Sequence, residues 1–169
     1  MTFPEITFAN VLDYIGTLAF AISGIRLAST KRFDWFGAYV VGLATAIGGG
    51  TVRDLLLDVP VFWMRNGIYF LITLLALLLV VLFGKVVVRQ KYTWFIFDTI
   101  GLGMFAVIGI EKTLGVGYPF WVAIVMGSVT GAGGGVIRDV FLNEVPLIFR
   151  AEIYAVACVL GGLAYWACP

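Results

Sequence analysis

The sequence GGGTVRDLLL, residues 48–57, recurs as GGGVIRDVFL, residues 133–142. In each copy three glycines fall inside a long apolar run, and an adjacent Arg-Asp pair follows shortly after them. Lipid makes both interrupted backbone and charged side chains energetically expensive. A stretch that combines the two and occurs twice therefore indicates the fold and marks the candidate functional site.

The composition is that of an integral membrane protein. Hydrophobic residues make up 62% and charged residues 12% of the 169-residue chain, against about 25% charged residues in an average soluble domain. The length fits a single transmembrane domain, residues 1–169. Net charge of +1 with scattered basic residues predicts no nucleic-acid partner, and the absence of histidine excludes a histidine relay or histidine-ligated metal. Cys158 and Cys168 are too far apart on one predicted helix to form a disulfide, so we expect packing roles.

Six apolar runs are each close to the roughly 20 residues that cross a bilayer. The predicted helices lie at about residues 7–27, 35–57, 67–88, 92–110, 120–142 and 151–167. The first run lacks the basic start of a signal peptide, so we predict a retained helix. The two halves, about 7–88 and 92–167, align without gaps; Asp13 matches Asp98 and Arg53 matches Arg138. Since three helices are an odd number, the sequence predicts an all-α membrane protein with two inverted three-helix repeats.

Loop charges predict the orientation of these helices. Seven of the nine Lys and Arg residues outside the two motifs fall on one side, chiefly in loops 26–32 and 85–91. The positive-inside rule makes that side cytoplasmic and the N-terminus outward. We therefore predict a multi-pass protein of the cell (inner) membrane.

Three successive glycines predict that helices two and five are broken or kinked, because each glycine costs about 1 kcal/mol relative to alanine in a helix. Broken backbone persists where protein or water covers it, and a half-helix after the break would place the arginines near its positive end. The alternative is that glycine serves close helix approach. The predicted pore-lining or gating residues are Gly48, Gly49, Gly50, Arg53, Asp54, Gly133, Gly134, Gly135, Arg138 and Asp139.

The four charges of the motifs are expected to line water or to pair with each other. One structural interpretation pairs Arg53 with Asp139 and Arg138 with Asp54 across the pseudo-axis. Further polar candidates for a pore are Asp13, Asp98, Ser23, Thr45, Ser128 and Thr130. The two aspartates fall in the predicted first turns of helices one and four, where the helix dipole also stabilises carboxylates, and the hydroxyls also suit helix packing.

Other charges are predicted to be peripheral. Asp58, one helical turn after Asp54, is expected at the membrane interface on the same helix face. Glu111, Lys112 and Glu144 are expected to be solvated loop charges. The chain offers no nucleophile beside a base, and its glycines match no nucleotide-binding motif. We therefore predict that it is not an enzyme.

With its two glycine-Arg-Asp motifs in helices two and five of two inverted repeats, the whole chain resembles the prokaryotic TRIC-type channels, relatives of the trimeric intracellular cation channels. The resemblance implies a homotrimer in membrane lipid, with one pore per protomer lined by helices two and five, which are kinked at their glycine triplets. It implies passage of monovalent cations, potassium with some sodium, and Arg53 and Arg138 as pore-facing basic residues of a gate. No cofactor beyond permeating K⁺ or Na⁺ and bound lipid, and no soluble protein partner, is expected.

The same similarity group, UPF0126-like, is also described as containing glycine transporters. A secondary transporter of glycine or a similar small amino acid is therefore the alternative function, with a carboxylate held at a half-helix end and Asp54 or Asp139 near the ammonium. The family usually has a seventh helix after the repeats, and this sequence ends after the sixth. A non-transporting membrane scaffold is the third hypothesis.

Overall fold

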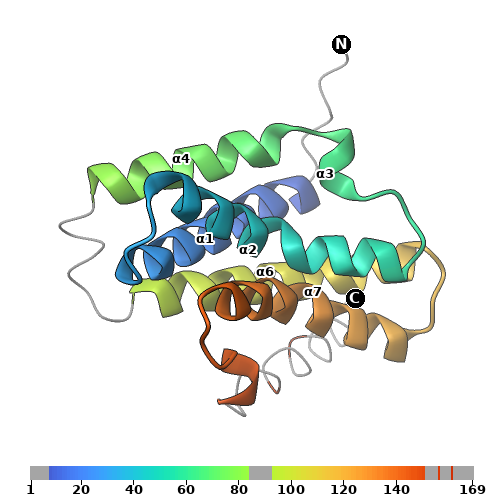
Figure 1. Cartoon of the computed structure of the whole chain (residues 1–169). Helices are drawn as coiled ribbons and strands as arrows, with labels where there is room; N and C mark the ends of the chain where they lie inside the picture. Colours follow the sequence, from blue (N-terminus) through green and yellow to red (C-terminus); the bar gives the residue numbers. More distant parts are fainter. Residues whose placement is uncertain (1–7, 84–92, 151–155, 157–160, 162–169) are drawn as a thin grey trace.

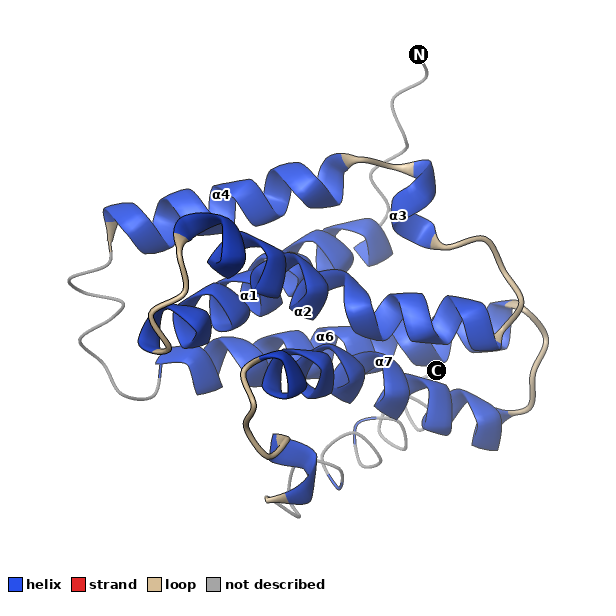
Figure 2. Cartoon of the chain, in the orientation of Figure 1, coloured by secondary structure: helices blue, strands red, loops and turns tan. Residues whose placement is uncertain are grey.

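The computed structural model describes residues 8–83 and 93–150, together with residues 156 and 161. Within those residues the chain is helical and contains no strand (Figures 1 and 2). The long helices are α1 (Phe8–Thr30), α2 (Trp35–Leu56), α6 (Thr93–Gly115) and α7 (Phe120–Phe141). The shorter ones are α3 (Phe62–Arg65), α4 (Ile68–Leu82) and the 3-10 turn η1 (Leu147–Phe149).

The four long helices are each apolar and long enough to cross a membrane. Helix α4 is apolar but has only 15 residues, so its described part is shorter than the span predicted at 67–88. The rest of that span, residues 84–88, lies outside the described residues. So do nearly all of the predicted sixth helix and both cysteines, so these predictions remain untested. The short elements α3 and η1 were not predicted.

Equivalent helices of the two halves pack against each other in antiparallel fashion. Gly16 of α1 faces Phe105 of α6, while Phe20, one turn later in α1, faces Gly101, one turn earlier in α6. The rings of Phe20 and Phe105 lie 5.1 Å apart at 58°, and both side chains are buried. This pair of opposed helices forms the centre of the core, and α2 and α7 pack along them (Figure 1).

The two glycine triplets lie where α2 and α7 cross. A Cβ atom placed on Gly49 would lie 2.1 Å from the carbonyl oxygen of Thr130, and one on Gly134 would lie 2.1 Å from that of Thr45. No side chain fits at either position, so glycine is required for this approach of two backbones. The contacts are equivalent under the sequence offset between the halves, which relates them by a pseudo-two-fold axis.

The predicted break at the triplets is wrong, whereas the other expectation, a kink there, stays a prediction. Both α2 and α7 continue as helix through residues 48–50 and 133–135. An uninterrupted helix keeps its backbone hydrogen bonds satisfied where water is scarce, and the close helix contact offsets the weak helix propensity of glycine. The alternative interpretation, close helix approach, therefore describes these residues.

Two residues in left-handed conformation end the crossing helices. Asp58 has φ 52° after α2, and Asn143 has φ 53° after α7. The next backbone N–H groups, of Val59 and Glu144, donate to the carbonyls of Asp54 and Asp139 at 3.0 and 2.8 Å, a hydrogen-bond pattern that closes a helix end. Asp58 is thus outside the helix, so its predicted place on the Asp54 helix face is wrong.

Candidate functional site: two arginine clusters

Arg53 and Asp54 form a buried ion pair in the last turns of α2. The Nη2 atom of Arg53 lies 2.7 Å from Asp54 Oδ1, and its Nε donates to the same oxygen at 2.8 Å. Lys112, near the end of α6, supplies a second cation with its Nζ 2.8 Å from that oxygen. The ring of Phe62 lies 5.8 Å from Arg53 Cζ and 6.0 Å from Lys112 Nζ, within range of cation–π attraction.

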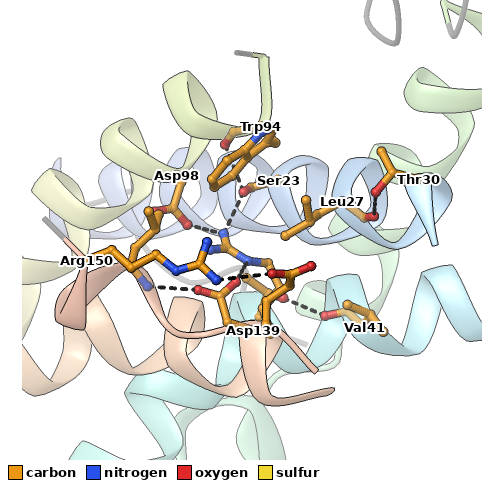
Figure 3. A network of polar contacts seen from close by, with 12 residues as sticks. Ser23, Leu27, Thr30, Val41, Trp94, Asp98, Asp139 and Arg150 are labelled. Carbon is orange, nitrogen blue, oxygen red and sulfur yellow. Dashed lines mark hydrogen bonds and ion pairs between the residues drawn. The ribbon is translucent and has the colours of Figure 1, made fainter. Parts of the chain in front are cut away.

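Arg138 occupies the matched position in α7 and is completely buried, among the polar groups of Ser23, Asp98 and Asp139 that Figure 3 shows. Its Nε donates to Asp139 Oδ1 at 2.8 Å, and its Nη1 forms an ion pair with Asp98 and donates to Ser23 Oγ at 2.8 Å. The Trp94 ring centre lies 5.4 Å from Arg138 Cζ. The remaining nitrogen, Nη2, is buried without a hydrogen-bond partner among the described residues. One arginine thus gathers groups from α1, α6 and α7.

The ion pairs differ from those expected across the pseudo-axis. Each arginine pairs with the aspartate next to it in sequence, and Arg138 also pairs with Asp98 of its own half. Because neither helix is broken, both arginines lie in the last turn of a complete helix. A cation there is favoured by the negative end of the helix dipole, which is the reverse of the half-helix position predicted.

Asp13 and Asp98 lie in the second turns of α1 and α6, one turn later than predicted. Asp13 Oδ2 accepts a hydrogen bond from the hydroxyl of Tyr69 in α4, and Asp98 binds Arg138. The two matched carboxylates therefore have partners of different charge.

The second carboxylate oxygen of each motif aspartate accepts a hydrogen bond from the loop that follows its helix. Asp54 Oδ2 accepts the backbone N–H of Phe62 at 3.0 Å, and Asp139 Oδ2 accepts that of Leu147 at 3.1 Å. Each carboxylate therefore binds its arginine with one oxygen and the returning loop with the other. This arrangement explains why a short helix or turn begins at the same place in both halves.

Two pockets reach the clusters from opposite ends of α1 and α6. The Arg53 pocket has a volume of about 550 Å³, and the Asp139 pocket a volume of about 210 Å³. Residues lining the Arg53 pocket include Ala9, Asn10, Asp13, Arg53, Phe62, Tyr69, Ile108, Glu111, Lys112, Gly115 and Val116. Those lining the Asp139 pocket include Leu27, Trp94, Asp139, Glu144, Val145, Leu147 and Arg150. Along α1, Asn10 and Leu27 are separated by roughly 26 Å at 1.5 Å per residue, close to the thickness of a bilayer core.

Three of the candidate hydroxyls satisfy themselves within their own helices. Thr45 donates to Val41 O, and Thr130 donates to Met126 O, both at 2.6 Å. Ser128 donates to Ile124 O at 3.0 Å and lines a separate apolar pocket on α7. Among the described residues, Ser23 alone of the four forms a hydrogen bond with an arginine of the motifs.

Sequence reasoning missed four residues of the clusters: Phe62, Tyr69, Trp94 and Lys112. Of these, only Lys112 had a predicted place, in a solvated loop. Lys112 could have been found from the sequence. Extending the predicted fourth helix by one turn beyond residue 110 places Lys112 on α6. Within the described residues, no three His, Cys, Asp or Glu side chains form a group that could hold a metal ion.

Comparison with solved structures identifies the architecture. The TRIC trimeric intracellular cation channel orthologue from Rhodobacter sphaeroides superposes with a TM-score of 0.89 at 37% identity, covering 94% of this chain and 82% of that one. A prokaryotic TRIC channel crystallised in 0.5 M KCl gives 0.87 at 34% identity, with the same two coverages. The fold therefore defines an all-helical membrane protein of TRIC-like architecture, a class without enzymatic activity.

Sequence relatives give the family. The family model described as Glycine transporter matches twice, over residues 10–85 and 95–169. The UPF0126 inner membrane protein YadS of Escherichia coli (strain K12) is 42% identical over 160 residues, 91% of this chain and 75% of the relative. The UPF0126 membrane protein YvgT of Bacillus subtilis (strain 168) is 43% identical over 157 residues, 91% and 77%. The chain belongs to this UPF0126, or Glycine transporter, family, and it is a multi-pass membrane protein.

Proposed function

We propose that the chain is a monovalent cation channel, conducting potassium and some sodium through one pore in each protomer. The observation that carries this proposal is the likeness to solved cation channels at 34–37% identity and TM-scores of 0.83–0.89. The path runs from the Arg53 pocket, past the crossing of α2 and α7, to the Asp139 pocket. Both Arg-Asp pairs line it, and the glycine triplets line it once α2 and α7 separate at their backbone contact.

The charges at the two clusters favour cations once the arginines move. Arg138 carries one positive charge among the carboxylates of Asp98 and Asp139. If its side chain withdraws, two carboxylates are left beside the path, and they attract a cation strongly where little water screens them. The arginine acts as a tethered counter-ion that blocks the path until it moves.

A reversal-potential measurement tests this function. Purified protein in a planar bilayer under a KCl gradient is expected to give currents that reverse near the potassium potential. Currents that reverse at the chloride potential would contradict a cation channel. The Gly49→Leu variant is the control: its side chain cannot fit against Thr130, so it should insert and carry no current.

A secondary transporter of glycine or a similar small amino acid is the second candidate. The family model's description favours it, and two pockets separated by closed clusters also suit alternating access. Saturable uptake of labelled glycine into proteoliposomes, without potassium current, would select the transporter. If correctly inserted protein shows neither glycine uptake nor potassium current, the non-transporting scaffold is the hypothesis that is left.

We also propose a homotrimer in the cell membrane, with loop 26–32 cytoplasmic. One of the solved relatives is described as trimeric, and many large apolar side chains of the described residues are exposed, including Trp35, Phe36, Leu82 and Phe149. Native mass spectrometry tests the trimer. Labelling of Lys31→Cys and Arg65→Cys by an impermeant thiol reagent in intact cells tests the orientation; only the second should react.

A further inference from the structure

Lys112 shares the carboxylate of Asp54 with Arg53. The Nζ atom of Lys112 lies 2.8 Å from Asp54 Oδ1, the same oxygen to which Arg53 donates through Nε at 2.8 Å. Two cations therefore meet at one carboxylate oxygen. The Asp54 side chain is fully buried, whereas the Lys112 side chain is 32% exposed and lines the Arg53 pocket. Lys112 is thus the most exposed of these three charges.

The other half of the molecule has no counterpart of this lysine. The offset that aligns the two glycine motifs places Leu27 opposite Lys112, and Leu27 lines the Asp139 pocket. At that end one arginine, Arg138, forms ion pairs with two carboxylates, those of Asp98 and Asp139. The matched arginines therefore have opposite additional partners, a second cation at one end and a second carboxylate at the other.

Lys112 has contacts of its own that do not depend on Arg53. It lies in the last turn of α6, where the negative end of the helix dipole favours a cation. Its Nζ lies 6.0 Å from the centre of the Phe62 ring, and the Phe62 backbone N–H donates to Asp54 Oδ2 at 3.0 Å, which holds the carboxylate in place. When the Arg53 side chain withdraws from the path, Asp54 therefore keeps Lys112 as its partner, and the pocket keeps a positive charge.

We propose that Lys112 makes the Arg53 end of the path selective for monovalent over divalent cations. This inference rests on the proposed channel function. The Coulomb energy between a fixed charge and a passing ion is proportional to the charge of the ion, so Lys112 repels Mg²⁺ twice as strongly as K⁺. Asp13 and Glu111 line the same pocket, and their carboxylates attract a divalent cation twice as strongly. Lys112 offsets that attraction.

Reversal potentials with MgCl2 on one side and KCl on the other test the proposal. Lys112→Met removes the charge and keeps an unbranched side chain. It should raise the Mg²⁺ to K⁺ permeability ratio about tenfold, the effect of one unit charge roughly 12 Å from the ion at an effective dielectric constant near 20. Lys112→Arg keeps the charge and should retain the wild-type ratio, and Leu27→Met is the control at the matched position. An unchanged ratio in Lys112→Met would overturn the proposal.

A second measurement does not depend on current. Val116 is exposed and lines the same pocket, so Val116→Cys, in a protein with Cys158 and Cys168 replaced by alanine, reports the local potential. The rate of its modification by a cationic methanethiosulfonate, divided by the rate for an anionic one, should rise several-fold when Lys112→Met is added. An unchanged rate ratio overturns the inference. A shifted rate ratio in a protein without any cation current supports the charge effect of Lys112 and refutes the channel function alone.

Discussion

Gly49 and Thr130 touch backbone to backbone: a Cβ atom on the glycine would lie 2.1 Å from the threonine carbonyl oxygen. The matched pair, Gly134 and Thr45, repeats the same distance. Such contact leaves no flexible side chain that could move aside. The crossing of α2 and α7 is therefore fixed by main chain on both sides, at the midpoint between the two arginine clusters.

Replacing either central glycine by alanine should separate the crossing helices. We expect Gly49→Ala and Gly134→Ala each to lower the free energy of unfolding by about 1–3 kcal/mol, the usual cost of overpacking a core. Gly103, on the open surface of α6, has nothing within 4 Å of an added Cβ, so Gly103→Ala should stabilise by up to about 1 kcal/mol. Titration with SDS in detergent micelles measures all three. Equal effects at Gly49 and Gly103 would refute the close crossing.

The apolar runs predicted the helices well because lipid leaves few alternatives to a helix for a run of that length. The starts of α2 and α7, at Trp35 and Phe120, agree with the prediction. The predicted break was wrong because helix propensity describes the residues of an isolated helix. Helix propensity carries no information about a neighbouring helix whose backbone comes so close that only glycine fits.

The ion pairs of the two clusters could not be predicted from the sequence, for a related reason. The motif placed Arg53 near Asp54, but the structure adds Lys112, which depends on α6 extending to Gly115 and not ending near residue 110. The contact between Ser23 and Arg138 joins residues 115 positions apart. Spacing within one helix does not reveal such a partner.

Removing the carboxylate of Asp54 should leave the positive charges of Arg53 and Lys112 without their negative partner. Asp54 is fully buried and bonds Arg53, which is 3% exposed, as well as Lys112 and the Phe62 backbone. Asp54→Asn should therefore lower the free energy of unfolding by about 3 kcal/mol, the lower end of the usual cost of removing one partner of a buried ion pair. Glu111→Gln, one residue from Lys112 but exposed, should stay within about 0.5 kcal/mol of wild type. SDS unfolding curves make the comparison; a loss for Asp54→Asn no larger than for Glu111→Gln would contradict it.

The left-handed residues that end the crossing helices should tolerate glycine and reject β-branched side chains. Asp58 and Asn143 have φ values of 52° and 53°, where an ordinary L residue costs about 1–2 kcal/mol. Asp58→Val and Asn143→Val should each lose stability by about that amount, whereas Asp58→Gly and Asn143→Gly should be close to neutral. Thermal unfolding in detergent distinguishes the two sets. Valine variants as stable as the glycine variants would show that the helix ends do not depend on this conformation.

Glu144 should give the protein a small pH-dependent stability. Its carboxylate accepts one hydrogen bond from Lys31, which belongs to the first half of the chain, and another from Arg150 at 3.2 Å. These bonds and the positive charges lower the pKa of Glu144 below its usual value.

A lowered pKa in the folded state means that the unfolded state binds the proton more readily. The stabilising contribution is therefore complete above the ordinary glutamate range, about pH 4.3, and is lost as pH falls through the lowered pKa. The difference in stability between wild type and Glu144→Gln should follow this course in acid titration, and it should shrink in 1 M KCl, where the Debye length is about 3 Å. Glu111→Gln supplies the control without these partners. A difference that grows as the solution is acidified would mean that the carboxylate is held in its protonated form, and the pairing with Lys31 and Arg150 would then be wrong.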